Sequence, residues 1–333
     1  MLKTIAIISV VIMHTMVLYK EADEVISPLL ATVAVPVFIM ISAYLRTKKI
    51  QKIGIRGAYA PRYMFVSFMS LMLAYVFIVV IEMIGCLPIH LAGHPLPLKA
   101  EFYDSVPKFF VWLFTGTLGF GSYYIPIMVE LIVVFPLIYM LFIKSRTAGL
   151  VLSFLLNGAY DLLQYYLGMH ADAYRLLIFR LILMLGFGVY LGLQKEFDKK
   201  SDIIAAVFLV IGLCYVIVNA YVYEFTVFGE WATSSMLVAP FAYGYFYFMM
   251  KFFKNVKPHK IFILGKASYH IFLVQMLFFF FWGNFILYAL FGKLPTAISI
   301  PCQIAVSVPL TCTLGYLFYR LETRLRAKLH ISH

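Results

Sequence analysis

Long apolar runs, separated by short polar or basic segments, recur along the whole chain. Ten of them approach the length of roughly twenty residues that an α-helix needs to cross the hydrocarbon core of a bilayer. They fall at 2–19, 29–45, 63–85, 123–143, 147–168, 173–193, 202–223, 231–250, 261–282 and 296–319. A further apolar stretch at 106–116 is too short to span and is expected to form a re-entrant or interfacial helix. The pattern predicts an all-α, polytopic membrane protein with about ten transmembrane helices, forming a single domain over residues 1–333.

The composition agrees with a chain whose outer solvent is lipid. Hydrophobic residues make up 63% of the sequence and charged residues only 13%, and the mean hydropathy is +0.93. A soluble domain has about a quarter of its residues charged, so this chain could not cover a water-facing surface. The four cysteines show no CxxC spacing and are expected to act as small apolar residues rather than as metal or redox groups.

The basic residues predict the orientation. The net charge is +12, but the basic residues lie in short loops between apolar runs, which indicates membrane topology rather than nucleic-acid binding. With the N-terminus placed inside, 21 of the 27 Lys and Arg fall in inner segments and five in outer ones. Both termini are therefore expected to be cytoplasmic, in a multi-pass protein of the cell membrane. No cleavage site follows the first apolar run, so we expect it to remain as a helix.

One histidine lies where the lipid should exclude ionisable groups. His14 is in the first span, eleven residues after Lys3. Eleven residues are almost three helical turns, so the two side chains should share a face about 16 Å apart. Lys3 would then lie at the cytoplasmic rim and His14 deep in the membrane, where an ionisable side chain is expected to be functional. The alternative is a histidine that only hydrogen-bonds to a neighbouring helix.

Other polar residues fall at a similar depth in the predicted topology. Glu130, Asp161 and Arg180 lie in the fourth, fifth and sixth spans, and Gln275 lies in the ninth. All should occupy the outer half of the bilayer with His14, which favours one internal polar site. An Arg180–carboxylate pair that merely ties helices together is the alternative.

Two further groups of residues are expected to have no role in such a site. Glu82, at the outer end of the third span, is expected to meet water. His90 and His94 have the i, i+4 spacing of a zinc site on a helix, but Pro88, Pro95 and Pro97 disfavour a helix there. No metal site is expected.

Four local patterns resemble the acyltransferase-3 family of bacterial integral-membrane acyltransferases. The first is the spacing of Lys3 and His14 in LKTIAIISVVIMHT, where the family has a basic residue, usually Arg, ten residues before an essential His. The others are PVFIMISAYL (36–45), YYIPIMVELIVVFPLI (123–138) and LGKASYHIFLVQ (264–275). Together with the ten spans, the resemblance covers nearly the whole chain.

The sequence also departs from the family pattern. Lys3 replaces the usual Arg, so a point charge stands in place of a bidentate fork. Gln275 occupies the position of a His in many members, and Ala43 that of a Gly. The family often has an R-x-x-R before the third span. Arg56 and Arg62 lie nearby but out of register, and they are carried over as candidate cofactor-binding residues beside Lys3.

The resemblance implies transfer of an acyl group, expected to be acetyl, from cytoplasmic acyl-CoA to a hydroxyl of an extracytoplasmic carbohydrate or lipid-linked sugar. Acyl-CoA would be a donor substrate, with no permanently bound cofactor, and the basic loops 46–62 and 251–266 would face its phosphates. His14 would be the general base. Glu130 or Asp161 could orient its ring, and Arg180 or Gln275 could stabilise the oxyanion; nothing in the sequence excludes a covalent acyl-His intermediate.

Two other functions fit the residues. An exporter of a saccharide or lipid-linked unit would also need polar groups inside a helical bundle. The chain shows no pair of related halves of the kind common in transporters, which favours the enzyme. A non-catalytic partner of an envelope enzyme would leave the shared depth of His14 and the other polar residues unexplained.

Overall fold

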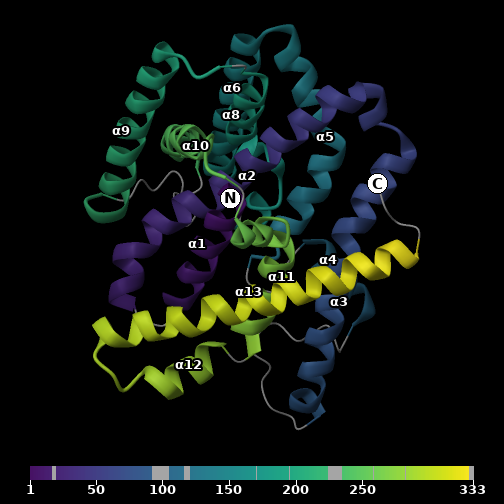
Figure 1. Cartoon of the computed structure of the whole chain (residues 1–333), viewed down its shortest axis with the longest axis vertical. Coiled ribbons are helices and arrows are strands. Elements are labelled where there is room, and N and C mark those ends of the chain that lie inside the picture. Colours follow the sequence, from purple (N-terminus) through teal and green to yellow (C-terminus); the bar gives the residue numbers. More distant parts are fainter. Residues whose placement is uncertain are drawn as a thin grey trace.

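The computed structural model describes residues 1–16, 20–91, 105–115, 121–169, 171–194, 196–223, 235–257, 259–281 and 283–329. Within these ranges every regular element is a helix (Figure 1). The elements are α1 (Leu2–Met16), α2 (Lys20–Ala58), α3 (Pro61–Leu91), α4 (Val106–Thr115), α5 (Tyr124–Lys144), α6 (Arg146–Leu167), α7 (Ala171–Tyr174), η2 (Ile178–Leu181), α8 (Ile182–Leu193), α9 (Lys199–Tyr221), η4 (Met236–Val238), α10 (Ala239–Phe253), η5 (Lys260–Gly265), α11 (Ser268–Phe281), α12 (Gly283–Phe291) and α13 (Thr296–Lys328).

Among the residues that the structure describes, five helical segments are long and apolar enough to cross a membrane. They are Pro28–Ala58, Pro61–Pro88, Tyr124–Lys144, Lys199–Tyr221 and Thr296–Lys328. Shorter apolar helices cover Leu2–Met16, Val106–Thr115, Ile178–Leu193 and Ser268–Phe279. The structure therefore confirms an all-α membrane protein, and it adds the short helix α12, which the apolar pattern did not predict.

Three helices extend well beyond their predicted spans, and one of them is α13, which continues past residue 319 to Lys328. The second span was expected to end near residue 45, but α2 continues to Ala58 with a kink at Gly54, whose φ of 73° favours glycine. Helix α3 runs through Pro88 to Leu91, so this proline does not end the helix where the sequence suggested. His94, Pro95 and Pro97 lie outside the described residues.

The apolar run at 173–193 is interrupted rather than continuous, because α7, η2 and α8 are separate elements. A carboxylate oxygen of Glu130 on α5 accepts a hydrogen bond from the Ile178 backbone N–H at 2.7 Å. The side-chain oxygen of Asn157 on α6 similarly accepts from the Leu183 N–H at 3.4 Å. Because lipid offers no hydrogen bonds, an irregular segment at membrane depth needs such internal partners.

Small residues set the closest helix contacts. A Cβ added at Gly188 on α8 would lie 2.5 Å from the Met40 carbonyl oxygen on α2, and one at Gly212 on α9 would collide with the Phe241 backbone on α10. Both α2–α8 and α9–α10 are therefore packed backbone to backbone, as small residues permit in membrane proteins.

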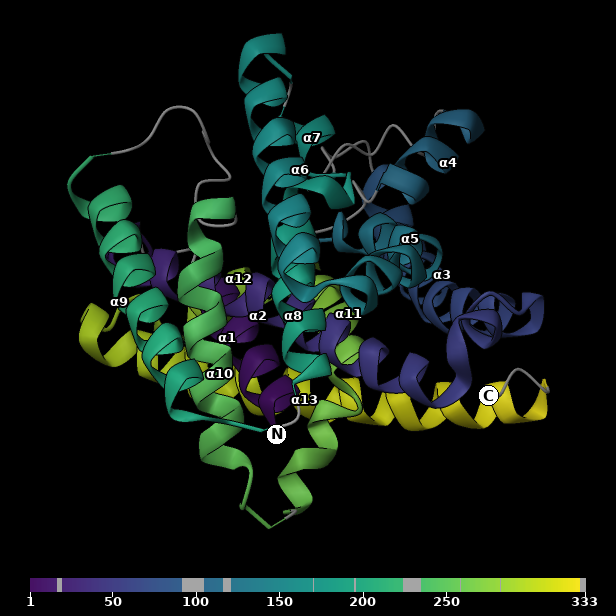
Figure 2. The same cartoon turned by 90° about the horizontal axis from the view of Figure 1, so that it is seen from above.

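The last long helix lies across the others. In both views α13 runs across the molecule and passes α1 and α11 (Figures 1 and 2). Its inward side is polar, because Ser299, Gln303, Ser307 and Thr311 follow one another at four-residue spacing and are fully buried. The hydroxyls of Ser307 and of Thr15 on α1 share a hydrogen bond of 2.8 Å. Helix α13 thus joins the end of the chain to its first helix.

Candidate active site

A cavity of about 330 Å³ lies between α1, α2, α5 and the start of α11. This volume is at the lower end of the range for small-molecule sites. Its wall consists of Lys3, Val10, Met13, His14, Ala31, Val35, Phe38, Ser42, Leu71, Gly121, Tyr123, Tyr124, Met128, Ser268, Tyr269 and Phe272.

Helix α1 presents Lys3 and His14 to this same cavity, with Val10 between them. Residues 3, 10 and 14 fall on one face of an α-helix, which is why all three side chains of α1 can line the same cavity. The rise per residue separates Lys3 from His14 by about 16 Å along the axis. The His14 ring lies 6.0 Å from the Phe279 ring of α11, centroid to centroid. The predicted common face of Lys3 and His14 is thus confirmed.

The remaining polar groups of the wall are hydroxyls. The side chains of Ser42 and Tyr124 hydrogen-bond to each other. The Tyr269 hydroxyl donates to the Leu71 carbonyl oxygen at 2.8 Å, which fixes its ring against α3. Between these groups the surface is aliphatic and aromatic. The cavity therefore suits a ligand with a charged end and a slender, mostly neutral body.

Arg46 lies near the basic end of the cavity, although it is not part of the wall. It is on α2 one turn after Ser42, close enough to Lys3 for the two positive charges to interact and close to the Tyr124 hydroxyl. Among the described residues neither Lys3 nor Arg46 forms an ion pair with a carboxylate. Two neighbouring cations without a carboxylate, partly removed from water, are chemically suited to an anion.

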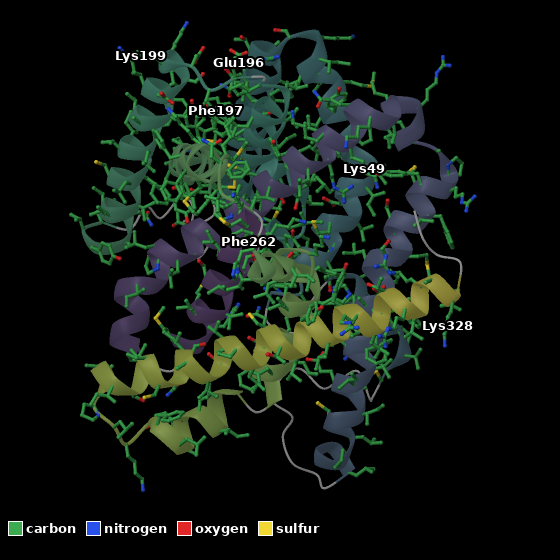
Figure 3. All side chains as sticks on the ribbon, viewed as in Figure 1. Lys49, Glu196, Phe197, Lys199, Phe262 and Lys328 are labelled. Atoms are coloured by element: carbon green, nitrogen blue, oxygen red, sulfur yellow. The ribbon has the colours of Figure 1, made fainter. Side chains whose placement is uncertain are left out.

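The two arginines predicted to assist Lys3 lie elsewhere. Arg56 and Arg62 are both exposed, and neither is part of the cavity wall. They follow Arg46 along the basic stretch of α2 and its connection to α3, on which Lys49 is labelled in Figure 3. Arg46 was in the predicted basic loop but was not singled out, because only the packing of α1 on α2 brings it to Lys3.

Glu130, Asp161 and Arg180 form a second polar group behind the cavity wall. Asp161 accepts hydrogen bonds from the Tyr174 hydroxyl at 2.6 Å and from the Asn157 amide at 3.2 Å. Arg180 is completely buried, and its guanidinium lies 5.3 Å from the ring centre of Tyr123, a residue of the cavity wall. Together with Glu130 at Ile178, these side chains hold the interrupted segment before α8.

The structure therefore does not bring all the predicted polar residues into one site. His14 and Lys3 line the cavity, whereas Glu130, Asp161 and Arg180 are absent from its wall. The group connects to the cavity through Tyr123, and Asp161 and Arg180 are close enough for their charges to interact. Catalytic roles for these three residues stay predictions.

Gln275 on α11 is fully buried, and its amide makes no hydrogen bond with any residue that the structure describes. It shares a helical face with Phe272, which lines the cavity, and with Phe279, which contacts His14. A buried amide without a partner costs about 1–3 kcal/mol. Gln275 is not part of the cavity wall, and a catalytic role for it stays a prediction.

Two further sets of buried ionisable residues were not predicted. Glu82, expected to meet water, is only 5% exposed and packs near Tyr75 and Cys86. His270 Nε2 lies 3.3 Å from the Glu322 carboxylate, which also pairs with Arg326. The i, i+4 spacing of Glu322 and Arg326 was a detectable signal, whereas only the fold could show that His270 meets them.

Comparison with known proteins gives a single result. The family model described as "Acyltransferase domain" matches residues 1–320, nearly the whole chain. No curated protein and no solved structure matches the chain.

Proposed function

The chain belongs to this family of acyltransferases, and from that premise we propose that it moves an acyl group, expected to be acetyl, from cytoplasmic acyl-CoA to a hydroxyl of an extracytoplasmic carbohydrate or lipid-linked sugar. The main support is that Lys3 and His14 line one cavity about 16 Å apart. The family makes an enzyme a better proposal than an exporter or a non-catalytic partner.

The proposed topology has ten spans with both termini in the cytoplasm. It rests on the distribution of Lys and Arg, of which 21 are in the inner segments. In this orientation Lys3 and Arg46 are at the cytoplasmic end of the cavity, where acyl-CoA would enter. His14 lies deeper, where an acceptor from the other side would arrive.

The basic end of the cavity suits the phosphates of CoA. Lys3 supplies a point charge, and Arg46 supplies the planar fork that the Lys at position 3 lacks. The pantetheine arm would extend between Ser42 and Phe38 on α2 and Tyr124 on α5. This path leads the thioester from the two cations to the imidazole.

His14 is the general base of the proposed reaction. Its neutral imidazole takes the proton of the acceptor hydroxyl as the oxygen attacks the thioester carbonyl. The tetrahedral intermediate then collapses, the C–S bond breaks, and the CoA thiolate takes the proton from the His14 imidazolium, which returns the ring to its neutral form. An imidazole is suited to this step because its ordinary pKa lies near neutral pH. Acyl transfer through His14 itself is the alternative route.

Gln275 is the proposed donor to the oxyanion. Its amide N–H groups have no partner among the described residues, and its helix face is the one that meets His14 through Phe279. An oxyanion formed at the thioester carbon would accept the hydrogen bond that the resting protein lacks. This assignment gives a reason for an otherwise unfavourable buried amide.

The replacement His14→Ala tests the mechanism. Loss of a general base is expected to lower the rate roughly a hundredfold or more, with CoA binding and thermal stability close to wild type. His259→Ala, at an exposed histidine outside the cavity, is the matched control. The assay follows thioester loss from acetyl-CoA with candidate acceptors, alongside melting in detergent. Normal turnover by His14→Ala, with only a lower melting temperature, would reject the mechanism.

A further inference from the structure

Helices α1 and α2 both line the cavity of His14, and their residues can be matched by height. Lys3 at the start of α1 is close to Arg46 on α2. Further along α1, Val11 belongs to the same buried apolar cluster as Ala34 of α2. The two helices, which pack side by side (Figure 1), are therefore antiparallel, and equal numbers of residues cover equal distances along both.

Val35 is the residue of α2 at the height of His14. Because His14 comes eleven residues after Lys3, its counterpart on the antiparallel helix comes eleven residues before Arg46. That counterpart is Val35, and both side chains are part of the cavity wall. The next wall residue of α2 is Ala31, which lies one turn, or about 6 Å, further from Lys3. Beside the imidazole, α2 therefore presents a branched side chain first and a single methyl group beyond it.

The distance from the basic end of the cavity to His14 matches the length of a pantetheine arm. About thirteen bonds join the phosphorus of this arm to its sulfur, and an extended chain gains roughly 1.2 Å per bond, so the arm reaches about 16 Å. Lys3 and His14 are separated by about 16 Å along α1. An arm of this length takes up most of a cavity of about 330 Å³, which is small for a ligand site. The acyl group and the acceptor hydroxyl must therefore share the space around His14, Val35 and Ala31.

We propose that Val35 limits the acyl group to about two or three carbons. Its isopropyl group stands beside the thioester carbonyl, so the methyl of an acetyl group reaches it and a chain of four carbons or more collides with it. Ala31 leaves the space in which the acceptor hydroxyl approaches the carbonyl. One methylene more than a hydrophobic pocket accepts lowers kcat/KM roughly 10- to 200-fold. The inference rests on the proposed acyl transfer and narrows its donor to short-chain acyl-CoA.

The first test measures binding without turnover. Purified full-length protein in detergent is titrated calorimetrically with S-ethyl-, S-propyl- and S-butyl-CoA, which are thioethers of matching length without a carbonyl to attack. In wild type, the Kd should rise about tenfold or more from S-ethyl- to S-butyl-CoA. Val35→Ala removes two methyl groups and should remove most of this difference. Equal wild-type affinities for the three analogues, or an unchanged Kd ratio in Val35→Ala, would overturn the proposal.

Val37→Ala is the matched control, because it makes the same change on the same helix. Val37 is only 2% exposed and is not part of the cavity wall. The control should keep the wild-type Kd ratio, although the loss of buried methyl groups lowers its melting temperature. If it shifts the ratio as far as Val35→Ala does, a general loosening of α2 explains the effect and the proposal fails.

Val35→Ile acts in the opposite direction and carries the test if Val35→Ala does not fold. Its added methylene should raise the Kd for S-propyl-CoA about tenfold relative to that for S-ethyl-CoA. A Kd ratio equal to that of wild type would show that the acyl chain does not meet this side chain.

The second test separates the selection of the acyl chain from acyl transfer itself. Acetyl-CoA and butyryl-CoA are offered as donors with the same acceptor, and the two kcat/KM values are compared. Val35→Ala should raise the ratio of butyryl to acetyl transfer about tenfold or more, and Val37→Ala should leave it unchanged. The expected Kd ratios in a protein that transfers no acyl group would contradict the proposed function alone. Transfer with a ratio that Val35→Ala does not change would contradict the role of Val35 alone.

Discussion

Replacing Arg46 by Gln should have opposite effects on the empty and the CoA-bound protein. Arg46 and Lys3 are neighbouring cations with no carboxylate pair among the residues that the structure describes. Like charges in a partly buried site repel by on the order of 1 kcal/mol. The variant without ligand should therefore melt at the same temperature as wild type or higher.

The loss of CoA affinity follows from the contact that disappears. A hydrogen bond to a charged group contributes about 1.5–3 kcal/mol, and each 1.4 kcal/mol is about a tenfold change in Kd. Arg46→Gln should thus raise the Kd for CoA roughly ten- to hundredfold. At a CoA concentration about 100 times the wild-type Kd, bound CoA stabilises the wild-type protein by about 2.7 kcal/mol. A variant that binds CoA a hundredfold more weakly would be stabilised by only about 0.4 kcal/mol.

The assay is thermal melting in detergent over a CoA titration, with calorimetric Kd values as a second measurement. Arg56→Gln is the control, because it removes the same charge from the same helix at an exposed position outside the cavity. It should bind CoA like wild type. If Arg46→Gln and Arg56→Gln weaken CoA equally, or if Arg46→Gln only lowers the stability of the empty protein, the anion site is wrongly placed.

Three further outcomes can be measured. Lys3→Arg should keep or improve the apparent affinity for acetyl-CoA, whereas Lys3→Glu should abolish it through repulsion of the phosphates; equal affinities in the two variants would contradict a phosphate contact. Glu130→Leu should lower the free energy of unfolding by about 1–3 kcal/mol, because the Ile178 N–H loses its acceptor. Glu130→Gln, which keeps an oxygen, should restore most of this stability, and similar melting of Leu and Gln variants would argue against that role. A fluorescent reporter fused to the C-terminus should be bright, since it matures only in the cytoplasm; a dark fusion at normal expression would reject the ten-span topology.

The helical period and the lengths of the apolar runs were enough to predict some features from the sequence. The spacing of Lys3 and His14 gave their common face, and the apolar runs gave the long helices α5, α6 and α9 within a few residues. These features depend on one segment at a time. For the same reason the pattern missed the break between α7 and α8, because the segment contains neither proline nor a helix-ending glycine.

The candidate site depends on contacts between distant segments, which spacing does not contain. The depth argument placed Glu130, Asp161 and Arg180 at the level of His14, but depth does not say toward which neighbour a side chain points. Those three residues instead surround an irregular backbone segment that the sequence did not predict. Arg46 shows the reverse: the sequence did not single it out, because its proximity to Lys3 follows only from the packing of α2 against the start of α1.

The hydrogen bond between Thr15 and Ser307 joins residues 292 positions apart, and this affects the order in which the protein is built. A ribosome releases α1 into the bilayer first and α13 last, so the polar side of α13 can reach α1 only after almost all the chain has been made. Until then Thr15, the residue next to His14, lacks its side-chain partner on α13. The packing of α1 beside His14 is therefore completed only at the end of biosynthesis, and chains interrupted before α13 enter the membrane without this contact.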